Sequence, residues 1–227
     1  LTQLSNVDFR PGTGTTSLFR RMSQARVGLT DGTRVTTRLV IAADGRSSPM
    51  REAAGIKVST RHYGQKALAF AVTHPIPHDN VSTEIHRSGG PFTLVPLPDF
   101  DGMPSSAVVW MDDGRATQDR ATLDVPAFEA EMSLRSCTLF GPLTLASPRT
   151  VWPIISQHAD RLSGERIALI AEAAHVVPPI GAQGLNMSLR DIASLLNLAQ
   201  KSPEQLGDAA MLDAYHKARY ADVQLRV

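Results

Sequence analysis

The sequence predicts a mixed α/β fold in which a parallel sheet of the nucleotide-binding kind is interrupted by an inserted antiparallel sheet. A strand, loop and helix pattern occurs near the start of the chain and again near its end, and strands that feed helices favour parallel pairing. Between them lie short extended segments separated by Gly, Pro and Asp, a pattern typical of antiparallel sheets. We therefore expect one domain formed by residues 1–60 and 156–227, and a second domain at residues 61–155.

The composition is that of a globular protein. The chain has 227 residues, of which 42% are hydrophobic and 20% are charged. Its formal net charge of +1 gives no basic field for a nucleic-acid partner. The single cysteine, Cys137, excludes an internal disulfide, favours a reducing compartment and is expected to be a packing residue. The sequence contains no apolar run of about 18 residues, the length that a membrane span needs.

The front of the chain predicts a hairpin followed by a buried strand. Residues 25–29 and 34–37 flank Asp31-Gly32, a turn dipeptide that joins paired strands. In the segment 38–43, Arg38 is followed by a continuous apolar run that ends on Asp44-Gly45, which indicates a buried strand and its turn.

The middle of the chain predicts a sheet followed by one helix. Asp124 precedes Val125-Pro126 and is a helix start, with Phe128 and Met132 on one face. Extended segments are predicted at residues 66–73, 82–86, 92–97 and 106–111.

The rear of the chain predicts a second buried strand at residues 166–170, a loop rich in Pro and Gly, and two helices. The second helix is expected to begin near Ala209, with Asp213 four residues before Lys217 as an ion pair. The apolar stripe of the first helix is Leu185, Leu189, Ile192, Leu196 and Ala199, and that of the second is Met211, Tyr215 and Ala218.

The ends of the two predicted strands carry the residues with ligand-binding chemistry. Glu172 follows the second strand, where a carboxylate can accept hydrogen bonds from ribose or ribityl hydroxyls. The free N–H groups at the start of the next helix stabilise negative charge, so this segment predicts an anionic or nucleotide ligand. Asp44 holds the matching place after the first strand, and Arg46 or Arg51 can contact a phosphate.

Three segments resemble one known family. The run from Ala171 to Asn186, followed by Asp191, is similar to the second flavin motif of the FAD-dependent aromatic-ring hydroxylases, the 4-hydroxybenzoate hydroxylase-like family. Residues 44–51 resemble that family's Asp-Gly-x-x-Ser-x-x-Arg motif and lie about 130 residues earlier, a separation typical of the family. Residues 82–98 resemble the substrate-domain sheet of its ubiquinone-biosynthesis branch.

The resemblance implies FAD as cofactor and NAD(P)H as co-substrate. It makes residues 1–60 and 156–227 parts of an FAD/NAD(P)-binding, Rossmann-like domain and residues 61–155 a substrate domain. Glu172 stands where the family has an Asp that binds the ribityl chain, and Ala171 stands where it usually has Gly. His175 is expected to be structural, and neither a catalytic residue nor a metal site is predicted. The residues expected to contact the cofactor are Asp44, Gly45, Arg51, Glu172, Pro178, Gly181, Gly184, Leu185 and Asn186.

The activity implied by the resemblance is hydroxylation of an aromatic ring with NAD(P)H and O₂. The implied substrate is a small aromatic compound or a prenylated phenol of the ubiquinone pathway, so we expect a cytoplasmic protein with peripheral contact to the inner membrane or to a biosynthetic complex. Two alternatives stay open: a truncated, non-catalytic relative acting as a structural or assembly subunit, and a flavin monooxygenase for another lipid or aromatic substrate. The family's first Gly-x-Gly-x-x-Gly turn has no match here, since Gly12 and Gly14 are interpreted as a turn, so the front of the FAD domain is expected to lie outside this sequence.

Overall fold

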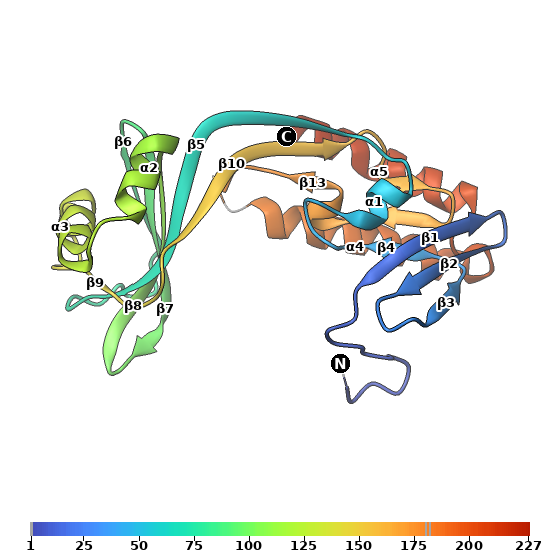
Figure 1. The fold of residues 1–227 in the computed structure, drawn as a ribbon, viewed down its shortest axis with the longest axis horizontal. Helices are drawn as coiled ribbons and strands as arrows, with labels where there is room; N and C mark the ends of the chain where they lie inside the picture. The colour runs from blue at the N-terminus through green and yellow to red at the C-terminus, as the bar shows by residue number, and fades with distance from the viewer. Residues whose placement is uncertain (1, 180, 182) are drawn as a thin grey trace. The chain divides into compact units, whose positions relative to one another are not determined.

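The computed structural model describes residues 2–179, 181 and 183–227 (Figure 1). Contacts divide the chain into unit 1, formed by residues 1–61 and 155–227, and unit 2, formed by residues 62–154. The strands β5 (Val58–Thr73) and β10 (Thr150–Ala159) each continue from one unit into the other, so two strands provide the connections. Each unit is described separately below.

Unit 1 begins with a small antiparallel sheet in the order β1-β2-β3. Its strands are β1 (Thr15–Arg21), β2 (Gln24–Leu29) and β3 (Arg34–Thr37). The hairpin predicted around Asp31-Gly32 is confirmed, with Val27 opposite Val35. Gly32 has a φ of +83°, which glycine adopts without strain. The strand β1 was missed because its residues are mostly polar and exposed, so it carries no apolar alternation.

The second sheet of unit 1 contains both predicted strand ends. Its order is β11-β12-β4, formed by β11 (Ser163–Gly164), β12 (Ile167–Leu169) and β4 (Val40–Ala42). The pair β12 and β4 is parallel, as predicted, with Leu169 opposite Ala42. All three residues of β12 are buried, whereas Ile41 in β4 is 50% exposed. The prediction of a fully buried front strand was therefore wrong, because β4 lies at the edge of this sheet.

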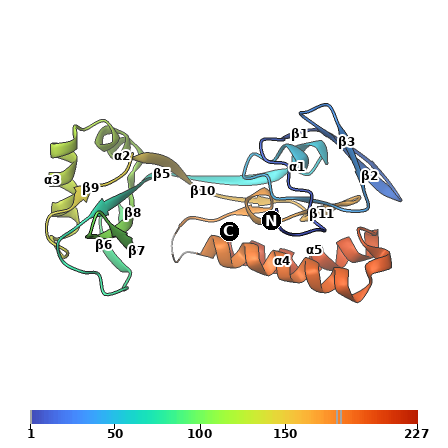
Figure 2. The same ribbon diagram turned by 90° about the horizontal axis from the view of Figure 1, so that it is seen from below.

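Two long helices, α4 (Gln183–Lys201) and α5 (Ala209–Arg226), lie side by side along unit 1 (Figure 2). Both were predicted. In α5, Met211 and Tyr215 are buried as expected, but Ala218 is exposed and the next residue, Arg219, takes the buried position. The expected pair with Lys217 was also wrong, since Asp213 binds Arg161 at 2.8 Å.

Most of the apolar stripe of α4 does not face the core of unit 1; the exception is its last residue, Ala199, which packs against that core. An apolar stripe normally marks the buried face of a helix, yet Leu185, Leu189, Ile192 and Leu196 are 71%, 53%, 47% and 52% exposed. The buried residues are instead Met187, Asp191 and Leu195. The spacing of apolar residues thus predicted the helix correctly, while the inward side was set by the polar partners of Asp191.

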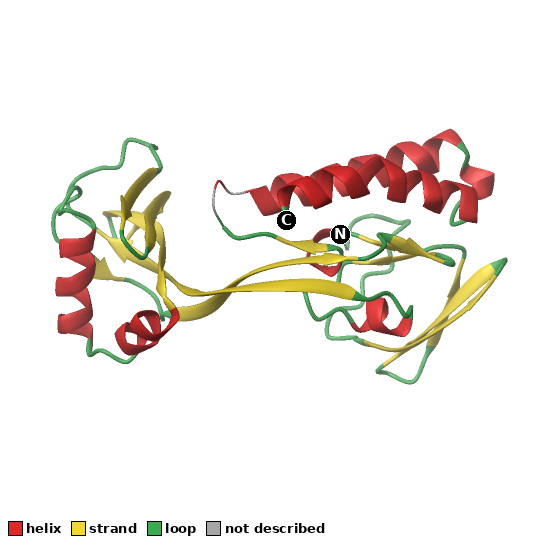
Figure 3. Cartoon of the chain, turned by 90° about the horizontal axis from the view of Figure 1, so that it is seen from above, coloured by secondary structure: helices red, strands yellow, loops and turns green. Residues whose placement is uncertain are grey.

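The strands of unit 2 pair antiparallel in the order β5-β8-β7-β6, and β9 (Thr144–Leu145) also pairs with β5. They belong to a sheet whose full order is β13-β10-β5-β8-β7-β6. Figure 3 draws the strands in yellow and the helices in red. The other strands of unit 2 are β6 (Thr83–Arg87), β7 (Gly90–Phe100) and β8 (Met103–Asp113). Every extended segment predicted in the middle of the chain therefore lies in a strand. Alternate residues of β5, including Leu68, Phe70 and Val72, are buried in the core of this unit.

The helices α2 (Gly114–Ala121) and α3 (Val125–Arg135) accompany this sheet. The Asp124 side chain accepts a hydrogen bond from the Ala127 N–H group, so α3 begins where the sequence predicts. Phe128 and Met132 are fully buried against the sheet core. Cys137, in contrast, is exposed, so its expected packing role was wrong.

The mixed α/β class is confirmed, with a parallel strand pair in unit 1 and an antiparallel sheet in unit 2. The short η1 (Ala171–Ala173) and the strand β13 (His175–Val176) follow the end of β12, and the helix α1 (Pro49–Ala53) follows the end of β4. Of the predicted site residues, Glu172 lies in η1 and Arg51 lies in α1. The turn η3 (Pro203–Gln205) connects α4 to α5. Among the described helices, none is both long and apolar enough to span a membrane.

Candidate flavin site

The site lies where two parallel neighbours, β4 and β12, end at the same edge of their sheet. Parallel strands bring their carboxyl ends together, and ligands of open α/β sheets bind there. Asp44 follows β4 and Glu172 follows β12, so both predicted carboxylates lie at this edge. Their surroundings differ, and the difference determines what each one can bind.

The carboxylate of Asp44 closes its own loop. One of its oxygens accepts a hydrogen bond from the Ser48 hydroxyl, and the other accepts one from the Met50 N–H group at 3.0 Å. Ser48 in turn caps α1 by accepting from the Arg51 N–H group at 3.0 Å. Gly45 has a φ of +87°, which explains the glycine in the Asp-Gly pair. Asp44 and Gly45 therefore shape this loop.

Arg51 connects the two strand-end loops. Its guanidinium donates to the Ala173 carbonyl and to the Arg46 carbonyl, both at 2.9 Å. The residue is only 3% exposed, and burial lowers the pKa of its guanidinium. Of the two arginines that the sequence offered for a phosphate, Arg51 is thus engaged between the loops, and Arg46 is the more exposed.

Glu172 faces outward from the turn η1. Its carboxylate pairs with the Arg46 guanidinium, with contacts of 3.3 and 3.5 Å between Nε and Oε2 and between Nη2 and Oε1. The side chain is 52% exposed, so at least one carboxylate lone pair is accessible to a ligand. A pair this long and this exposed stabilises little and can rearrange when a ligand binds.

The turn that carries Glu172 is hydrogen-bonded to the Asp191 side chain of α4. Ala171 has a φ of +54°, the left-handed region that favours glycine. Its N–H group donates to Asp191 Oδ2 at 3.1 Å, and His175 Nε2 lies 2.7 Å from the same oxygen. His175 is 2% exposed, which agrees with the structural role expected for it.

The beginning of α4 supplies the remaining predicted residues. Gly184, Leu185 and Asn186 lie in the first turn of α4, which contains no acidic residue, and their side chains are exposed. Their N–H groups belong to the helix start that has no partner within the helix. Pro178 is half-buried in the preceding loop, and Gly181, with a φ of +68°, is exposed there.

Two recesses of about 240 Å³ each open beside these residues. One is lined by Glu172, His175, Val176, Val177, Gly184, Leu185 and Ser188. The other is lined by Val177, Pro178, Gln183 and Arg226. A larger pocket of about 720 Å³, which includes Arg161, Arg166 and the start of α5, is formed by other residues and contains none of the predicted ones.

The residues around the first recess fit the flavin end of FAD. A carboxylate accepts hydrogen bonds from ribityl hydroxyls, and a helix start without acidic side chains stabilises the negative edge of a reduced flavin ring. Apart from its chain neighbours and the nearby backbone of α4, no described atom lies within 4 Å of the place where a Cβ on Gly184 would be, so a flat ring can approach the backbone there. Within the described part of the chain, no group of three or more His, Cys, Asp or Glu could hold a metal ion.

The sequence did not identify the buried residues whose hydrogen bonds hold the Glu172 turn in place, Asp191 and Arg219. Asp191 was recognised only as part of a motif, and Arg219 had no assigned role. The one local signal was the spacing of Arg219, Asp222 and Arg226, since the i, i+3 and i, i+4 pairs that they form are typical of a charged helix face. Their link to Asp191 joins residues 28 positions apart and has no sequence signature.

Comparison with known proteins identifies the family. The family model described as "FAD binding domain" matches residues 4–227. Ubiquinone hydroxylase UbiL of Rhodospirillum rubrum is 34% identical over 210 residues, which cover 91% of this chain and 48% of the relative. The 3-demethoxyubiquinol 3-hydroxylase of Escherichia coli is 26% identical over 91% of this chain and 52% of the relative. The chain thus spans about half the length of the curated relatives that it matches.

Solved structures share the fold. PqsL of Pseudomonas aeruginosa matches with a TM-score of 0.75 at 20% identity, over 95% of this chain and 60% of that one. OxyS anhydrotetracycline hydroxylase from Streptomyces rimosus matches with a TM-score of 0.68 at 19% identity, over 96% of this chain and 44% of that one. These likenesses concern the fold. Because the family model covers almost the whole sequence and a relative is 34% identical over 91% of it, the chain belongs to the FAD binding domain family of FAD-dependent aromatic monooxygenases.

Proposed function

We propose that the protein carrying this chain is an FAD-dependent monooxygenase that hydroxylates an aromatic ring with NAD(P)H and O₂. The observation that carries the proposal is the outward Glu172 carboxylate beside the acid-free start of α4. A ligand with a hydroxyl-rich chain suits the Glu172 carboxylate, and a negatively charged ring at the end of that chain suits the start of α4. FAD has such a chain, the ribityl chain, and its flavin ring is negative when reduced.

The proposed substrate is a prenylated phenol of the ubiquinone pathway. Support comes from two relatives, one named as a ubiquinone hydroxylase at 34% identity and one named as a 3-demethoxyubiquinol 3-hydroxylase at 26% identity. The antiparallel unit 2 is proposed to be the substrate domain and unit 1 part of the FAD domain. A prenylated substrate favours a place in the cytoplasm at the surface of the inner membrane, alone or in a biosynthetic complex.

The described residues have separate tasks in this proposal. Bound FAD supplies the redox chemistry that joins NAD(P)H, O₂ and the ring. Glu172 accepts hydrogen bonds from the ribityl hydroxyls, and the N–H groups of Leu185 and Asn186 stabilise the negative ring edge. Pro178, Gly181 and Gly184 let the loop backbone lie against the ring. Asp44, Gly45 and Arg51 keep the two strand-end loops in place.

The alternative is a non-catalytic relative that serves as a structural or assembly subunit. The observation favouring it is Ala171, which holds a left-handed backbone conformation without being glycine. Such strain costs about 1 kcal/mol. The turn nevertheless forms and presents Glu172 outward, so we favour the enzyme.

The visible spectrum of the full-length protein separates the two. The enzyme is expected to show flavin absorption and to consume NAD(P)H faster when a phenol with a prenyl tail is added. A matched phenol without the tail tests the substrate class, and equal stimulation by both compounds would favour another aromatic substrate. A colourless protein that cannot be loaded with FAD would overturn the enzyme and support the subunit.

A further inference from the structure

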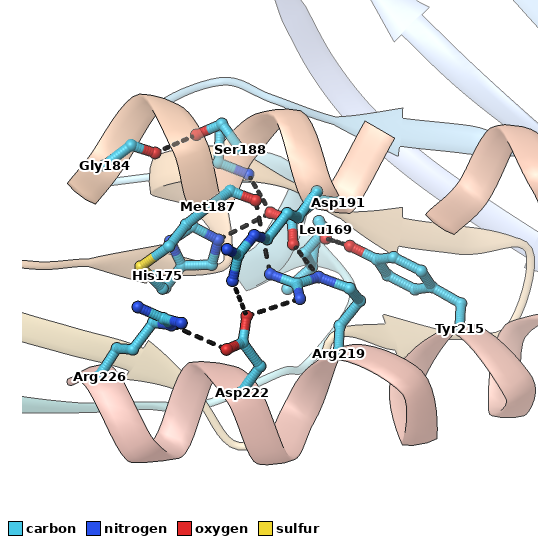
Figure 4. A network of polar contacts seen from close by, with 12 residues as sticks. Leu169, His175, Gly184, Met187, Ser188, Asp191, Tyr215, Arg219, Asp222 and Arg226 are labelled. Carbon is cyan, nitrogen blue, oxygen red and sulfur yellow. Dashed lines mark hydrogen bonds and ion pairs between the residues drawn. The ribbon is translucent and has the colours of Figure 1, made fainter. Parts of the chain in front are cut away.

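Asp191 is a fully buried carboxylate that joins three separate segments (Figure 4). Its Oδ2 accepts a hydrogen bond from the Ala171 N–H group at 3.1 Å and contacts His175 Nε2 at 2.7 Å. Its Oδ1 accepts from Arg219 Nε at 2.8 Å. The turn η1, the strand β13 and the helix α5 therefore meet at one side chain of α4.

Burying a carboxylate without a cation is costly, so Arg219 is the partner that makes this position possible. Arg219 is 6% exposed. Burial opposes its charge, but the hydrogen bonds to Asp191 and Asp222 outweigh burial and raise its pKa. Asp222 also pairs with Arg226 at 2.7 Å. Acidic and basic side chains therefore alternate from Arg226 through Asp222 and Arg219 of α5 to Asp191 of α4.

The bond from Ala171 selects the conformation of the turn. A left-handed Ala is less favourable than an Ala in the ordinary helical region. A hydrogen bond from an N–H group to a charged acceptor is stronger than one to a neutral acceptor and offsets that strain. Because Glu172 follows Ala171 directly, the same bond determines where the Glu172 carboxylate lies.

The helix α5 fixes two further points around the first recess. The Tyr215 hydroxyl donates to the Leu169 carbonyl at 2.7 Å, at the last residue of β12. Arg226 donates to the Gln183 side chain at 2.6 Å, at the first residue of α4. The strand end before Glu172 and the start of α4 after it are thus both attached to α5.

We propose that Asp191, held by Arg219, is a positioning residue of the flavin site: it sets the left-handed turn at Ala171 and so presents Glu172 to the ribityl chain of FAD. The proposal rests on the proposed function, since FAD is the ligand. Neither Asp191 nor Arg219 is expected to touch the cofactor. Their effect passes through the backbone of the turn and through α5.

Two readouts on the full-length protein test the proposal, with FAD itself as the probe. The first is hydrogen exchange of residues 170–177 in the FAD-free protein, which reports the Ala171 N–H bond without any ligand. The second is FAD affinity from quenching of flavin fluorescence. Asp191→Asn keeps the shape of the side chain but removes its charge. It is expected to increase the rate of hydrogen exchange at residues 170–177 and to raise the Kd for FAD about tenfold. Asp191→Ala is expected to increase both the exchange rate and the Kd further.

Met211→Ala is the matched control, because Met211 is a buried residue at the start of α5 whose sulfur accepts a hydrogen bond from the Gly207 N–H group. It is expected to lower thermal stability while leaving FAD affinity and exchange at 170–177 unchanged. If Asp191→Ala does not fold, Arg219→Lys gives a second variant that keeps a cation. It is expected to retain more FAD affinity than Arg219→Met.

The outcomes separate this proposal from the proposed function. A wild-type protein that binds no FAD contradicts the function. A wild-type protein that binds FAD, with Asp191→Asn binding equally well and exchanging at the wild-type rate, overturns the positioning role. Equal losses of FAD affinity in Asp191→Asn and Met211→Ala would also overturn it, because the effect would then follow stability alone.

Discussion

The two strand-end carboxylates of unit 1 occupy matching places and have different partners. Asp44 follows β4, and each of its oxygens accepts one hydrogen bond from its own loop, from the Ser48 hydroxyl and from the Met50 N–H group. Glu172 follows the parallel neighbour β12, and its partner is the Arg46 side chain, 126 residues away in the sequence. Both carboxylates are exposed. The difference between them is that the Asp44 carboxylate holds its own loop together, whereas the Glu172 carboxylate makes only a long ion pair.

The support behind the two turns also differs. The Asp44 carboxylate accepts its hydrogen bonds from neighbours within six residues, and α1 continues directly from its loop. The turn of Glu172 depends on Asp191, 20 residues away, and on Arg219 of α5. We expect substitutions near Asp44 to affect stability first, and substitutions near Glu172 to affect ligand binding first.

The largest effect is expected from Arg51→Met, which breaks the link between the two loops. The change leaves the Ala173 and Arg46 carbonyls without their charged donor, so the free energy of unfolding should fall by about 3 kcal/mol. Urea unfolding followed by circular dichroism measures this. A loss below about 0.5 kcal/mol, the range of ordinary surface substitutions, would mean that the loops hold each other by other contacts.

Next in size is the contrast between Asp44→Ala and Glu172→Ala. Asp44→Ala removes two acceptors from the start of α1 and should lower the free energy of unfolding by about 1 to 2 kcal/mol. Glu172→Ala loses one exposed ion pair and should change stability by less than about 0.5 kcal/mol. Equal losses in the two variants, measured by the same unfolding curves, would remove the distinction between them.

The charge network behind Glu172 predicts a pH dependence. Hydrogen bonds from Arg226 and Arg219 lower the pKa of Asp222 from 3.8 to about 2. A lowered carboxylate pKa contributes stability above pH 3.8 that is lost as the pH falls through about 2, and at neutral pH it is worth at most about 2 kcal/mol. Asp222→Asn should therefore be less stable than wild type at pH 7, with the gap closing between pH 4 and 2. A gap independent of pH would contradict this.

The smallest effect is expected from Ala171→Gly. Glycine adopts a φ of +54° without strain, so the substitution should raise the free energy of unfolding by up to about 1 kcal/mol. Thermal unfolding of the FAD-free protein checks the sign. A decrease would show that the turn at Ala171 is not strained, and that the bond to Asp191 has no strain to offset.

Local signals predicted much of this fold. The Asp31-Gly32 hairpin, the strand β12 and the start of α3 at Asp124 depend on residues within a few positions of each other. The inward side of α4 could not be predicted, because it depends on a buried acid whose partner lies in another helix. The sequence also could not tell which of Arg46 and Arg51 is buried. Arg51 is buried because it binds the Ala173 carbonyl, which is distant in the sequence.

The most direct test of the central claim compares FAD affinity in Glu172→Ala and Glu165→Ala of the full-length protein. Both remove one exposed carboxylate, Glu172 after β12 and Glu165 before it. If Glu172 binds the ribityl chain, its substitution should raise the Kd for FAD by about ten- to a hundredfold, and Glu165→Ala should leave it unchanged. The same Kd in both variants would contradict the assignment of Glu172 as the flavin-binding carboxylate.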